Sequence, residues 1–71
     1  MDRDLARFVL LLVNDKENYD RLQKIISAKI ENHRNSLETT KSPERISEIQ
    51  GAIAELRRMQ HLKEEVQAAA E

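Results

Sequence analysis

Residues 38–44 read Glu-Thr-Thr-Lys-Ser-Pro-Glu and form the clearest interruption in the sequence. Ser42 is a favourable residue for capping the start of a helix, and Pro43 suits the first helical position, where its missing N–H is not needed. Glu44 then lies in the first turn, where the helix dipole favours a negative charge. We therefore predict that a helix begins at Pro43, after a connection over 39–42 of the length that joins antiparallel helices.

The composition favours helices on both sides of this connection. The chain has 71 residues, of which 39% are hydrophobic and 35% charged, with one glycine and one proline. Leu, Ile, Glu, Lys, Arg, Gln and Ala, all good helix formers apart from Ile, make up most of the rest. We predict an all-α fold with one domain over 1–71. Because chains of this length rarely stabilise themselves with one core, we also expect the protein to be oligomeric.

The predicted second helix covers 43–69. Its apolar residues recur at spacings of three and four, which is typical of a helix with one buried face. These residues are Ile46, Ile49, Ile53, Leu56, Met59, Leu62 and Val66. The first four residues follow a 3-4-3 spacing, and the stripe drifts after Leu56 because Gln60 and Lys63 occupy the next positions of that pattern. Gly51, in mid-helix, either permits a close backbone approach or is a tolerated surface glycine.

The predicted first helix covers 2–38, and its continuity is the main open question. Its apolar stripe is interrupted at Asp15. One interpretation is a single long helix, which gives an antiparallel hairpin of two helices. The other is a break near Asn14, where Asn14 caps a new helix and Glu17 completes a capping box, which gives three helices.

A hairpin around this connection pairs position i with a position near 81 − i. Leu22 then lies opposite Met59, and Tyr19 opposite Leu62, while residues before Leu10 have nothing opposite. Yet residues 8–13 read Phe-Val-Leu-Leu-Leu-Val, which is apolar all round and therefore requires burial on more than one side. We expect no membrane span here, because a span needs about twenty apolar residues.

Two interpretations of this apolar run remain. It forms the core of a three-helix bundle, or it is a docking surface for a second copy or another protein. For the second interpretation we assign partner binding to the N-terminal run and to the stripe of the second helix. The residues are Leu5, Phe8, Val9, Leu12, Ile46, Ile49, Ile53 and Leu56.

The sequence offers little for chemistry. Without cysteine there is no disulfide, thiolate zinc site or cysteine nucleophile. His33 and His61 are the only imidazoles and lie near opposite ends of the predicted hairpin. We expect no enzyme activity, no catalytic or metal-ligating residues, no cofactor and no small-molecule substrate. The expected function is that of a small structural or adaptor protein.

The alternative function is that of a small regulator that binds nucleic acid. Arg57, Arg58 and Lys63 would form its basic patch. The net charge of −1 does not favour nucleic-acid binding, because phosphate contacts depend on positive charge.

Residues 44–59, with Ile49-Gln50-Gly51 at mid-helix and Ile53 and Leu56 after it, resemble a segment in small helical proteins of tailed bacteriophages. The resemblance covers about a quarter of the chain. It implies an accessory component of the virion or of the head–tail region. The expected location is then the virion or the host cytoplasm, and otherwise the cytoplasm.

Overall fold

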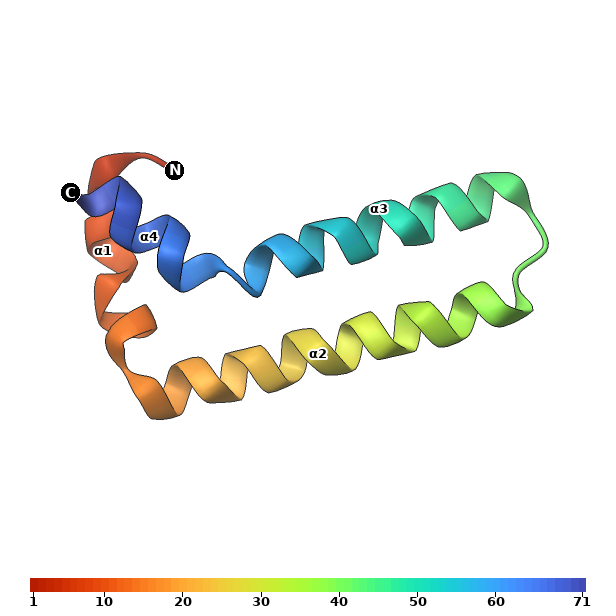
Figure 1. The fold of residues 1–71 in the computed structure, drawn as a ribbon, viewed down its shortest axis with the longest axis horizontal. Coiled ribbons are helices and arrows are strands. Elements are labelled where there is room, and N and C mark those ends of the chain that lie inside the picture. Colours follow the sequence, from red (N-terminus) through yellow and green to blue (C-terminus); the bar gives the residue numbers. More distant parts are fainter.

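The computed structural model describes residues 1–71 and consists of helices and short connections (Figure 1). The helices are α1 (Arg3–Asn14), α2 (Lys16–Thr39), α3 (Pro43–Met59) and α4 (Leu62–Ala70). The predicted all-α class is confirmed. The predicted number of helices, two or three, is wrong, because each of the two expected segments is interrupted.

The connection over 40–42 lies where the sequence predicts it. α3 begins at Pro43, and the Ser42 side chain accepts a hydrogen bond from the Arg45 backbone N–H at 3.4 Å. α2 ends at Thr39, and the Thr40 hydroxyl donates to the Ser36 carbonyl at 2.6 Å. α2 and α3 consequently lie side by side and run antiparallel (Figure 1).

The first break lies at Asp15, so the continuous first helix is wrong and the broken one is correct. The Asp15 backbone N–H donates to the carbonyls of Leu11 and Leu12, which closes α1. Its carboxylate accepts from the Asn18 backbone N–H at 3.2 Å and from the Asn18 side chain at 2.9 Å. Asp15, rather than the predicted Asn14, is therefore the residue that caps α2.

The second break, at Gln60 and His61, contradicts the predicted continuous helix over 43–69. The Gln60 N–H bonds to the Arg57 and Leu56 carbonyls, and the His61 N–H bonds to the Arg58 carbonyl at 3.0 Å. The bonds to Arg57 and Arg58 span three residues, and such i to i+3 bonds tighten the end of a helix. The chain then changes direction before α4, at the place where the apolar stripe drifts.

The core consists of two clusters. The central cluster lies between α2 and α3, and its buried members are Ile26, Ile30, Ile49 and Ile53. The terminal cluster lies between α1 and α4, and its buried members are Ala6, Val13 and Val66. Leu22 and Met59 both pack against the central cluster, and Tyr19 and Leu62 both pack against the terminal one.

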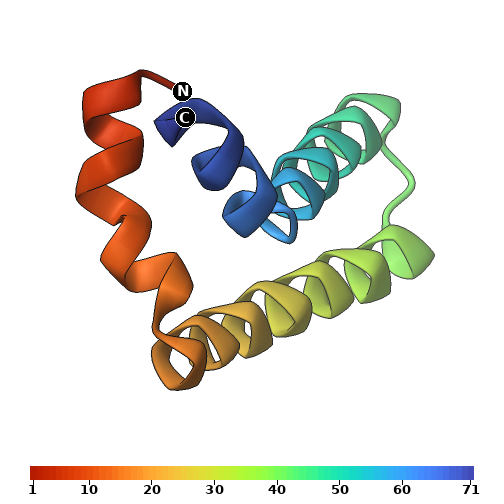
Figure 2. The ribbon, with the colours of Figure 1, turned by 60° about the vertical axis from the view of Figure 1, so that its left-hand side comes forward.

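The break at Asp15 allows α1 to turn back across α4 (Figure 2). Ala6 is thus fully buried, and the Arg3 guanidinium donates a hydrogen bond to the Glu71 backbone carbonyl. The prediction that residues before Leu10 have nothing opposite them is therefore wrong. No helix has both the length and the apolar content that a membrane span requires.

Gly51 permits no close approach, so that prediction is also wrong. The residue is exposed in the middle of α3, and a Cβ atom added to it would meet nothing within 4 Å. The alternative, a tolerated surface glycine, is the correct one.

Candidate protein-docking surface

α1 is apolar on two opposite faces, and the fold covers only one of them. The inner face carries Ala6 and Val13, which are buried, with Val9 and Leu10 half-buried beside them. These four side chains pack within the terminal cluster, whose α4 members include Val66. Because the chain breaks at Asp15, half of the apolar run over 8–13 packs within the chain. The three-helix interpretation predicts such packing.

The outer face of α1 consists of Leu5, Phe8, Leu11 and Leu12 and is largely exposed. Phe8 is 81% exposed and Leu11 84%, while Leu5 and Leu12 are 50% and 40% exposed. At 100° per residue, the four side chains span about 120° of the helix circumference. They form a continuous stripe of large apolar side chains along the whole of α1, and no other element of the chain covers it.

Geometry explains why the outer face stays uncovered. α1 packs against α4 on one side and meets α2 only at the turn (Figure 2). α4 has nine residues and α2 leads away from α1, so no helix remains to cover the opposite side. A helix that is apolar all round is normally buried on more than one side. The packing of the four helices thus leaves the outer face of α1 exposed.

The charges beside the outer face are few and of opposite sign. At 100° per residue, Asp4 lies at the N-terminal end of the outer face itself, and Arg7 borders the face beside Leu11. Neither residue takes part in a salt bridge. An apolar centre with a polar, solvent-accessible rim is the usual anatomy of a protein–protein interface. This border does not select a strongly basic or strongly acidic partner.

The structure separates the predicted partner-binding residues into two sets. Ile49 and Ile53 on α3 are buried against α2, so their side chains are not available to a partner. Ile46 and Leu56 are half-buried, and Leu56 packs against the central cluster. The α3 stripe forms the core of the chain itself, because the α2 stripe covers it.

The N-terminal set is brought together on one helix and remains exposed, apart from the half-buried Val9. Sequence reasoning omitted Leu11, the most exposed large apolar side chain of the chain. The unbroken apolar run over 8–13 was the signal for it. A stripe drawn at spacings of three and four from Leu5 skips this position.

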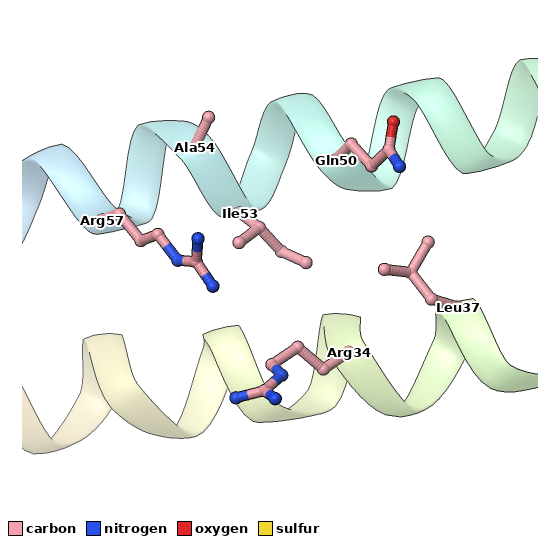
Figure 3. A pocket seen from close by; sticks show the side chains of 6 residues that line it. All are labelled: Arg34, Leu37, Gln50, Ile53, Ala54 and Arg57. Atoms are coloured by element: carbon pink, nitrogen blue, oxygen red, sulfur yellow. The ribbon is translucent and has the colours of Figure 1, made fainter.

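Two of the three predicted basic residues have different surroundings. Arg58 forms an ion pair with Glu55 at 3.7 Å. Arg57 instead lines a shallow groove between α3 and α2, together with Arg34 from the facing helix (Figure 3). The other lining residues are Leu37, Gln50, Ile53 and Ala54. Both arginines are exposed, so an anion held between them would remain largely hydrated.

Groups suited to catalysis or metal binding are not assembled. No polar or charged side chain is buried, and no three His, Asp or Glu side chains lie close enough to hold a metal ion. His33 is half-buried on α2, and His61 is exposed at the break before α4.

Comparisons with protein-family models, with curated proteins and with solved structures find no match. On the surface of this chain, the most exposed large apolar side chains, Leu11 and Phe8, both lie on the outer face of α1.

Proposed function

We propose that the protein is a small structural or adaptor protein that joins an assembly through the outer face of α1. The observation that carries the proposal is the exposure of Phe8 and Leu11 at the centre of an apolar stripe. Exposed apolar stripes with a polar border typically mark protein–protein interaction sites. The rest of the chain acts as a scaffold, because the terminal cluster packs α1 against α4.

The mechanism is helix docking. The outer face of α1 packs into an apolar groove or against another helix, and the partner removes Phe8 from water. An aromatic side chain at the centre of such a contact is a typical hot spot. The resemblance of residues 44–59 to small helical phage proteins supports an accessory role in the virion or head–tail region as the setting.

The test is recovery of the assembly with the tagged chain from cells in which it is naturally made. We expect Phe8→Asp to reduce the associated protein, including untagged copies of this chain, by about 30-fold, which corresponds to a hot spot of about 2 kcal/mol. Ile25→Asp is the matched control, because Ile25 is an exposed apolar side chain on α2, 56% exposed. The same recovery with Phe8→Asp as with the unchanged protein would overturn the proposal.

Nucleic-acid binding, the alternative function, has weaker support. The pairing of Arg58 with Glu55 and the turning of Arg57 into the α2–α3 groove divide the basic patch that it needs. A gel shift that persists at physiological salt and weakens steeply as salt rises would favour this alternative over docking.

A further inference from the structure

We infer that the partner on the outer face of α1 is a second copy of this chain, related by a two-fold axis that passes near Phe8. This inference rests on the proposed docking function and names its occupant. Three properties of the molecule support it: its excess surface, its net charge and the symmetry of the outer face.

The first support is the accessible surface area. The chain exposes 5483 Å². A compact monomeric protein of the same 8.3 kDa mass exposes about 4,600 Å², so this chain carries about 900 Å² more. Each partner of a standard-size interface buries about 800 Å². Summed over the whole chain, the excess surface is as large as the area that one subunit of a stable dimer buries, and the outer face of α1 carries the two most exposed large apolar side chains, Phe8 and Leu11.

The second support is electrostatic. Two copies with a net charge of −1 each repel one another only weakly, so nothing in the overall charge opposes self-association. At the outer face, Asp4 and Arg7 carry opposite charges and contribute no net charge between them. A partner with a strong charge of one sign would therefore gain no net electrostatic attraction from Asp4 and Arg7.

The third support is the arrangement of side chains around Phe8. On a helix, Leu5 lies one turn before Phe8, and Leu12 lies one turn after it on the same side. Antiparallel packing of two α1 helices about Phe8 thus places Leu5 beside the partner's Leu12, and the same contact recurs by symmetry. A two-fold interface uses the same patch on both subunits, and this stripe is complementary to itself.

The first experiment measures the solution mass by light scattering across a concentration series. We expect twice 8.3 kDa for the unchanged protein and for Ile25→Asp, and 8.3 kDa for Phe8→Asp with its helicity retained by circular dichroism. A monomer at every concentration, or a mass other than that of two chains, would overturn the second-copy inference.

The outcomes separate this inference from the proposed function. The unchanged chain could be monomeric while Phe8→Asp still reduces the recovery of other proteins from the natural assembly. In that case the docking function stands, and the inference that the partner is a second copy is wrong. If Phe8→Asp remains dimeric and also retains every associated protein, both are wrong.

The second experiment tests the antiparallel geometry with disulfides, which is straightforward because the chain has no cysteine. Leu5→Cys and Leu12→Cys are prepared separately, mixed under reducing conditions and then oxidised. In the mixture we expect a disulfide that joins one Leu5→Cys chain to one Leu12→Cys chain. When each variant is oxidised by itself, we expect few disulfide-linked dimers. Linkage of each variant to itself would indicate parallel helices, and no linkage in the mixture would place the contact elsewhere; either result overturns the inferred geometry.

Discussion

At the scale of single residues, Tyr19 replaces a helix cap that the local sequence lacks. The residue before α4, His61, makes no capping hydrogen bond with its side chain. The Tyr19 hydroxyl, on α2, instead accepts a hydrogen bond from the Lys63 backbone N–H at 3.1 Å. That N–H lies in the first turn of α4, where backbone donors have no partner within the helix. One side chain of α2 thus fixes where α4 starts.

We predict that Tyr19→Phe lowers the free energy of unfolding by about 1 kcal/mol, the usual net contribution of one hydrogen bond. Urea denaturation measures the change. Lys63→Pro removes the same backbone donor at a position in the first helical turn that tolerates proline. Tyr19→Phe should therefore cost much less in a Lys63→Pro background. An equal cost in both backgrounds would show that the hydroxyl acts through something else.

A substitution at Gly51, in contrast, should raise the free energy of unfolding. This residue lies in mid-helix, is exposed, and leaves open space where a Cβ atom would be. Gly51→Ala should therefore raise the free energy of unfolding by about 1 kcal/mol, because alanine loses less backbone freedom in a helix. Ala54→Gly, at another exposed position of α3, is the matched control and should lower stability by a similar amount. A destabilising Gly51→Ala would mean that this surface is covered in solution.

At the scale of elements, Asp15 determines how α1 lies relative to the rest of the fold. It ends α1 through its backbone N–H and starts α2 through its carboxylate. Without this break, α1 would continue along the axis of α2 and could not turn back onto α4. The terminal cluster and the orientation of the outer face therefore both depend on one residue.

We predict that Asp15→Ala lowers the free energy of unfolding by about 1 kcal/mol, because it removes an N-cap, whereas Asp15→Asn has little effect because asparagine caps equally well. The loss should be concentrated at the terminal cluster. Amide hydrogen exchange of α1 and α4 should therefore accelerate more than that of α3. Uniform acceleration over all four helices would contradict a local role for Asp15.

The elements also show how far sequence reasoning reaches. The helix start at Pro43 was predictable because Ser42 and Pro43 act locally. The break before α4 was not, because His61 offers no side-chain cap and the compensating Tyr19 hydroxyl is distant in sequence. The break at Asp15 was only one of two interpretations. A capping side chain permits a break, whereas the gain from burying Ala6 and Val13 against α4 selects it.

At the scale of the whole molecule, the chain is extended rather than compact. Its radius of gyration is 14.8 Å, whereas a compact domain of this length has a radius of about 11 Å. The two clusters bury only seven residues between them. The N-terminal candidate residues could be predicted from their apolar run, but the assignment of Ile49 and Ile53 to a partner was wrong. Sequence periodicity identifies an apolar face and does not say whether α2 or another protein covers it.

Because the core is divided into two clusters, the two clusters can form one after the other, and the chain separation within each cluster determines which forms more easily. Ile30 and Ile53 of the central cluster are 23 residues apart, whereas Ala6 and Val66 of the terminal cluster are 60 residues apart. Closing the longer loop costs about 0.8 kcal/mol more in chain entropy. During synthesis, moreover, α1 is made before α4. Both apolar faces of α1 are in contact with water until α4 has been made. The segment that carries the outer face of α1 is thus the one whose apolar side chains stay in contact with water longest while the chain is being made.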